Sequence, residues 1–77
     1  MTGDAAIDII FAEWRKAEKK FPSFPDDPVY GVAIMIEEAG ESMKAALDNH
    51  YKDGSIEDVR TELAQTAAMC IRCLIMT

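Results

Sequence analysis

Histidine and cysteine are scarce in this chain of 77 residues, and their scarcity excludes two kinds of metal site. His50 is the only histidine, and Cys70 and Cys73 are the only cysteines. A structural zinc site needs about four ligands, so the Cys-x-x-Cys pair has no partners with which to complete one. Because both cysteines lie in an apolar helical pattern, we expect buried thiols that pack as small hydrophobic groups. Di-iron carboxylate bundles use Glu-x-x-His pairs, and Leu47 stands three residues before His50, which excludes that class as well.

Long apolar runs and basic runs are absent too. No apolar stretch reaches the length of about 18 residues that a membrane span requires. The first residues lack the charged-then-apolar pattern of a secretion signal. We therefore expect no membrane association and a cytoplasmic location. The net charge of −6 and the lack of a basic run argue against nucleic acid as a partner.

Apolar residues, by contrast, are plentiful. They make up 49% of the sequence, which is too much for a disordered chain. We expect residues 1–77 to form a single domain, yet a chain this short has difficulty burying its apolar surface alone. The composition therefore predicts a homo-oligomer, a helical dimer or a larger assembly such as a tetramer.

The periodicity of the apolar residues predicts an all-α fold of three helices, with no competing strand pattern. The first helix is expected over about residues 4–20, with Asp4 as its N-cap. Asp27-Pro28 predicts the start of the second, which ends near Asn49. Ser55 begins the third, which continues to about residue 76. The expected apolar stripes are Ile7, Ile10, Phe11 and Trp14 in the first helix, Val29, Val32, Ile36, Met43 and Leu47 in the second, and Val59, Leu63, Ala67, Cys70 and Leu74, directed inward, in the third.

Two polar pairs at helical spacing are the main candidates for function. Glu38 and Glu41 are three residues apart, as are Glu62 and Gln65, so each pair shares one helix face. The short turn at Asp53-Gly54 predicts an antiparallel hairpin of the second and third helices. The two pairs then lie at similar distances from the turn and can face each other.

Oxygen ligands in this arrangement suit Mg²⁺, with Mn²⁺ as the alternative. Such an ion with several waters binds a phosphate chain and lowers the pKa of a water that attacks phosphorus. Glu37, next to Glu38, is a candidate to orient that water or to accept its proton. Gln65 contributes a neutral amide oxygen, which binds Mg²⁺ more weakly than a carboxylate does. Gly40 suggests that another helix or a ligand approaches the backbone closely.

Cations and flat apolar side chains would complete a nucleotide site. Lys44 and Arg72 are candidates for binding phosphate, although each can equally be an ordinary surface or ion-pairing charge. Phe11 and Trp14 are candidates for contact with a base, although packing in the core also explains them. The basic residues at the end of the first helix are accounted for by the helix dipole.

The segment Ile36-Glu37-Glu38-Ala39-Gly40-Glu41-Ser42-Met43-Lys44-Ala45, followed by Glu62-Leu63-Ala64-Gln65, resembles the MazG-type all-α nucleoside triphosphate pyrophosphohydrolases. Their signature is E-x-x-E followed, after a gap, by E-x-x-D, and the resemblance covers residues 28–76. It implies that Glu38, Glu41 and Glu62 are metal ligands and that Gln65 occupies the fourth ligand position. It also implies hydrolysis of the α–β phosphoanhydride of (deoxy)nucleoside triphosphates, in dimers or tetramers whose sites are completed by two subunits.

Gln65 is where the chain departs from this signature, and it favours the second of two alternatives that stay open. Phosphoribosyl-ATP pyrophosphohydrolases share the fold and the chemistry, but the motif is closer to MazG. The second alternative is a non-catalytic helical module with a weakened metal site, serving nucleotide sensing or oligomerisation.

Overall fold

The computed structural model describes all 77 residues and contains three helices and no strand. These are α1 (Gly3–Lys20), α2 (Pro28–Tyr51) and α3 (Ile56–Met76). The prediction of an all-α chain with three helices is therefore confirmed. No helix is both long and apolar enough to cross a membrane.

Capping residues explain where the helices begin. Thr2 caps α1 by accepting a hydrogen bond from the backbone N–H of Ala5, so the expectation that Asp4 is the N-cap is wrong. Asp4 lies inside the first turn, where a negative charge suits the helix dipole. Asp27 caps α2 with proline at the first position, and Ser55 caps α3, as the sequence predicts.

A tight turn joins α2 to α3. Asp53 adopts a positive φ of 61°, and the N–H of Gly54 donates to the carbonyl of Asp48 at 2.9 Å. A Cβ at Gly54 would lie only 2.9 Å from the Asp48 backbone, so glycine is required there by close approach. Asn49 closes the turn by donating its side-chain amide to the Gly54 carbonyl.

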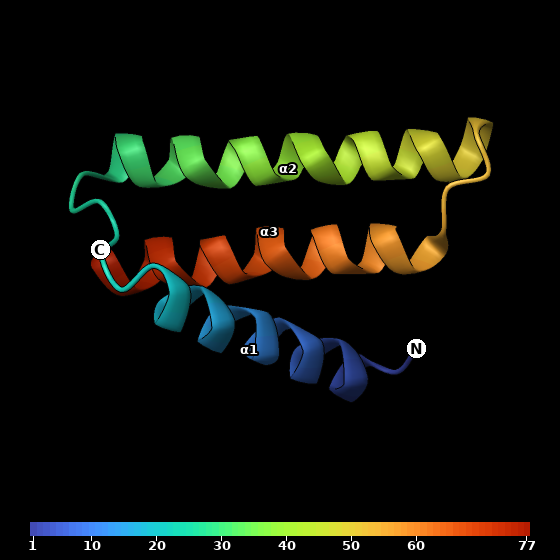
Figure 1. Cartoon of the computed structure of the whole chain (residues 1–77). Helices are drawn as coiled ribbons and strands as arrows, with labels where there is room; N and C mark the ends of the chain where they lie inside the picture. Colours follow the sequence, from blue (N-terminus) through green and yellow to red (C-terminus); the bar gives the residue numbers. More distant parts are fainter.

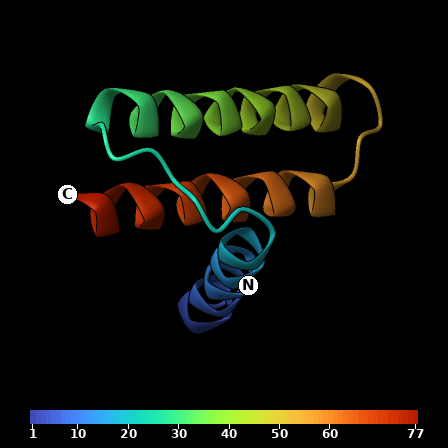
Figure 2. The ribbon, with the colours of Figure 1, turned by 60° about the vertical axis from the view of Figure 1, so that its left-hand side comes forward.

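The middle layer of the molecule is α3, because both other helices pack against it and not against each other. Figures 1 and 2 show α2 and α3 running side by side in opposite directions, with α1 crossing the other side of α3 obliquely. The extended segment between α1 and α2 passes the C-terminal end of α3 (Figure 1).

The core of the single chain is very small. Ala64 and Ala68 are its only buried hydrophobic side chains, and no large side chain is fully buried. The inward face of α3 is therefore formed by Ala64, Ala68 and Arg72.

The expected apolar stripes lie mostly outside this core. The inward stripe predicted for α3 is wrong, since Leu63 is 54% exposed, Leu74 is 74% exposed and Cys70 is exposed too. Cys73 is half-buried, and burial raises the pKa of its thiol. The other exposed members of the stripes are Val29, Val32, Ile36, Met43 and Leu47 in α2, and Ile7 and Phe11 in α1.

Candidate functional site

The two polar pairs lie along one side of the α2–α3 hairpin. Glu38 and Glu62 are half-buried, and Glu41 is exposed. Burial raises the pKa of Glu38, and repulsion by Glu62, Glu37 and Glu41 raises it further. None of these carboxylates makes an ion pair within the chain.

Two hydroxyl groups behind the acids set the register of the two helices. Ser42 and Thr66 contact each other across the helix interface at 2.8 Å. Each hydroxyl is also within hydrogen-bond distance of a carbonyl of its own helix, Thr66 of Glu62 at 2.9 Å and Ser42 of Glu38 at 3.3 Å, so either hydroxyl can donate across the interface. Because α2 and α3 run in opposite directions, Glu38 lies about one helical turn from this contact on the side away from the α2–α3 turn, and Glu62 lies about one turn from it on the side towards that turn.

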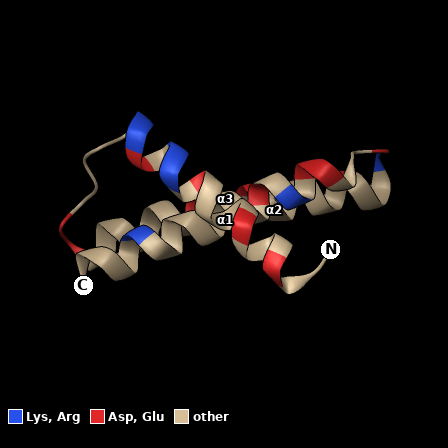
Figure 3. Ribbon diagram, turned by 90° about the horizontal axis from the view of Figure 1, so that it is seen from below, with Lys and Arg blue, Asp and Glu red and all other residues tan.

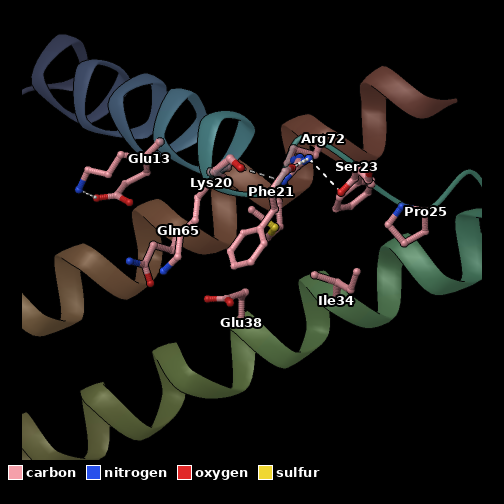
Figure 4. A pocket seen from close by; sticks show the side chains of 14 residues that line it. Glu13, Lys20, Phe21, Ser23, Pro25, Ile34, Glu38, Gln65 and Arg72 are labelled. Atoms are coloured by element: carbon pink, nitrogen blue, oxygen red, sulfur yellow. Dashed lines mark hydrogen bonds and ion pairs between the residues drawn. The ribbon is translucent and has the colours of Figure 1, made fainter.

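A pocket of about 610 Å³ opens where the three helices meet (Figure 4). Glu38 and Ile34 reach it from α2, Gln65 from α3 and Lys20 from α1. Its remaining lining residues are Glu13, Lys16, Ala17, Phe21, Ser23, Phe24, Pro25, Ala68, Met69 and Arg72.

A smaller groove of about 240 Å³ lies further along the hairpin, towards the turn. It is lined by the other two predicted ligands, Glu41 and Glu62, together with Lys44. Asp48 and Asp58 also line it, so Lys44 is the one cation among four carboxylates. The four predicted ligand positions are thus divided between two adjoining hollows. In the single chain, no three His, Cys, Asp or Glu side chains come close enough together to hold a metal ion.

Arg72 is occupied by the protein's own backbone. It is 5% exposed, and its guanidinium donates to the carbonyls of Phe21 at 2.5 Å, Ala17 at 3.4 Å and Ser23 at 3.5 Å. Its charge also lies 4.7 Å from the ring centroid of Phe24. Arg72 therefore closes the C-terminal end of α1 and holds the segment that follows it.

Phe11 and Trp14 lie apart from both hollows, since neither lines them. Their ring centroids are 6.3 Å apart, and Phe11 is 49% exposed. The Trp14 indole N–H is buried without a hydrogen-bond partner. Nothing in this arrangement brings the two rings to the polar pairs.

Three polar residues of α1, Glu13, Lys16 and Lys20, line the larger pocket and were not predicted as site residues. Lys16 and Lys20 are four residues apart, and this spacing is the one signal in the sequence that places them on a common face. The oblique crossing of α1 over α3 brings that face to Glu38 and Gln65, and such a crossing leaves no local mark in the sequence.

Comparisons with protein families, curated proteins and solved structures return no match for this chain. The resemblance to the MazG-type enzymes depends on residues 36–45 and 62–65 of the sequence alone. It remains a prediction, and the arrangement of the site supports the proposal below.

Proposed function

We propose that the chain is a Mg²⁺-dependent nucleotide pyrophosphohydrolase that cleaves (deoxy)nucleoside triphosphates to a monophosphate and pyrophosphate. The observation in its favour is that Glu38, Glu41, Glu62 and Gln65 line two hollows of the α2–α3 hairpin, Glu38 and Gln65 the larger one and Glu41 and Glu62 the smaller. Carboxylates that repel one another are suited to a divalent cation, which removes the repulsion.

The donor set fits magnesium. Three carboxylates and one amide supply only oxygen atoms, which Mg²⁺ prefers, and Glu38, Glu41, Glu62 and Gln65 would hold the ion with waters completing its shell. When bound, the ion would neutralise phosphate charge and lower the pKa of a water molecule. Mn²⁺ suits the same oxygen ligands.

The protein's own residues position the reacting groups. Hydrolysis forms a bond between a water oxygen and the α-phosphorus and breaks the bond from that phosphorus to the oxygen bridging to the β-phosphorus. The leaving group is pyrophosphate, and the water's proton needs an acceptor. Glu37 is exposed and adjacent to Glu38, and we assign it that role.

The proposal includes assembly with a second copy of the chain. Residues two apart on a helix point about 200° apart. Ile36, Met43 and Leu63 stand two residues from Glu38, Glu41 and Gln65, so they point away from the polar side. Their exposed fractions are 58%, 59% and 54%.

The far face of the two helices is comparable in size to one side of a dimer interface. The 24 residues of α2 span about 36 Å, and two adjacent helices are about 20 Å wide, giving a face of roughly 700 Å². A stable interface takes roughly 800 Å² from each partner. A second copy would bury this face, which no part of the single chain covers.

A non-catalytic helical module is the second candidate. It is favoured by Gln65 and by the lack of a three-residue ligand cluster in the single chain. In that case the exposed apolar face would serve assembly alone, and the polar side would bind nucleotide without cleaving it.

The decisive experiment incubates the purified protein with Mg²⁺ and a panel of dNTPs. We expect release of pyrophosphate and not of single phosphate, with the activity lost in Glu41→Gln. Glu18→Gln, an equally conservative change at an exposed position of α1 outside both hollows, serves as the control. No turnover on any nucleotide, combined with no Mg²⁺ binding in calorimetry, would favour the non-catalytic module. Gln65→Asp should then tighten Mg²⁺ binding if the site lacks only one ligand.

Light scattering after size-exclusion chromatography tests the assembly. The wild type should have at least twice the mass of one chain, and Met43→Glu should shift it towards the monomer. The matched control, Lys52→Glu, changes an exposed residue outside the apolar face. A monomeric wild type at all concentrations would refute this part of the proposal.

A further inference from the structure

The larger pocket has an unusual charge for this protein. Its charged lining residues are three basic and two acidic, whereas the chain as a whole has a net charge of −6. In Figure 3 the basic residues gather at the C-terminal end of α1, the end that reaches this pocket. A lining with more basic than acidic residues, in an acidic protein, prompts the question of which of its cations can meet an anionic ligand.

Neither cation expected from the sequence is well placed to hold phosphate there. Lys44 lines the other hollow, among four carboxylates that repel anions. The guanidinium of Arg72 donates hydrogen bonds to three backbone carbonyls. The remaining basic residues of the pocket are Lys16 and Lys20.

Among the basic residues that line the pocket, Lys20 is the one with neither an ion pair nor a hydrogen bond to another residue. Lys16 pairs with Glu13 at 3.2 Å, whereas Lys20 makes no ion pair. The Lys20 ammonium lies 5.4 Å from the ring centroid of Phe21. Figure 4 shows Lys20 extending from α1 into the pocket on the side of Gln65, with Glu38 reaching in from α2.

We propose that Lys20 binds the phosphate chain of the substrate, with Lys16 as a second, weaker contact. This inference rests on the proposed function, because it assumes that the ligand is a polyphosphate held beside Glu38 and Gln65. A lysine ammonium is a compact charge that suits phosphate oxygens. Phe24, Ile34 and Met69, apolar residues of the same lining, would then contact the nucleoside.

A role in stabilising the helix dipole can be distinguished from phosphate binding, because Lys19 and Lys20 would share the first role but not the second. A cation near the C-terminus of α1 stabilises the helix whether it is Lys19 or Lys20, since both lie in the last turn. Lys19 is exposed and does not line the pocket. Lys19→Ala is therefore a matched control that removes the same charge from the same turn.

The experiment measures binding of inorganic tripolyphosphate by calorimetry in the presence of Mg²⁺, which needs no turnover. Losing a charge-assisted hydrogen bond should weaken binding about 10- to 100-fold in Lys20→Ala. Lys19→Ala should stay within about twofold of the wild type, and Lys20→Arg should restore most of the affinity. Circular dichroism verifies that each variant is folded.

Hydrolysis of dNTPs, measured in parallel, separates this inference from the proposed function. If the wild type binds tripolyphosphate through Lys20 but cleaves no nucleotide, the inference stands and the proposed function fails. If the wild type cleaves nucleotides and Lys20→Ala keeps the same KM and affinity, the inference is overturned and the function stands. Equal losses in the two alanine variants, or no tripolyphosphate binding by the wild type, also overturn the inference.

Discussion

Replacing Arg72 by methionine should destabilise the protein strongly, because this side chain supports the end of α1. Methionine keeps the apolar stem and removes the guanidinium with its three carbonyl contacts. A hydrogen bond from a charged donor contributes about 1.5–3 kcal/mol. The contact with Phe21 is short, whereas those with Ala17 and Ser23 lie near the distance limit and contribute less.

The expected loss in the free energy of unfolding is therefore about 3 kcal/mol, with the lost contact to the Phe24 ring included. That is a large part of the roughly 5–15 kcal/mol that stabilises a typical domain. Arg72→Lys should recover only part of the loss, because an ammonium cannot reproduce the planar fork of donors.

Urea unfolding followed by far-UV circular dichroism measures this loss. All variants must be compared at one protein concentration, because assembly would make stability depend on it. Arg60→Met is the control, since Arg60 is partly exposed and pairs only with Glu57 on its own helix. That change should cost less than about 0.5 kcal/mol. If Arg72→Met costs as little as the control while nucleotide binding collapses, the structural role is refuted and a phosphate-binding role is supported.

Three further predictions follow from the same geometry. Gly40→Ala should stabilise an isolated chain by about 1 kcal/mol, because a Cβ there meets nothing within 4 Å; weaker dimerisation in the same variant, by light scattering, would show that a second copy packs against Gly40. Glu38→Gln should raise the melting temperature at pH 7 in EDTA. Because the pKa of Glu38 is raised in the folded state, its ionised side chain destabilises the protein at pH 7, and Glu38→Gln would remove that cost. The gain in melting temperature should vanish below the ordinary pKa of a glutamate, where Glu38 is protonated in both the folded and the unfolded state. A gain that does not change with pH would contradict this reasoning. Ser42→Ala should cost about 1 kcal/mol in urea unfolding, and Ser23→Ala, whose hydroxyl makes no hydrogen bond, should cost almost nothing.

The ends of the helices were predictable because capping is local. Asp27-Pro28 and Ser55 each satisfy the free N–H groups of the turn that follows them, and no distant residue is needed. Thr2 was missed in favour of Asp4 because both are good N-caps, two residues apart, and only the backbone angles distinguish them.

The sequence by itself determined the three helices, the turn between α2 and α3 and the spacing within each polar pair, because all of these depend on residues a few positions apart. Periodicity identifies an apolar face, but it does not say whether that face packs within the chain or against another molecule. Only the tertiary structure decided that Ala64 and Ala68 face inward while Ile36 and Met43 face outward. It likewise decided that Arg72 donates hydrogen bonds to backbone carbonyls and that Lys20 lines the pocket. Both outcomes depend on how α1 lies against α3, and that arrangement joins residues more than 50 positions apart in the sequence, as Arg72 with Ala17 and Phe21 shows.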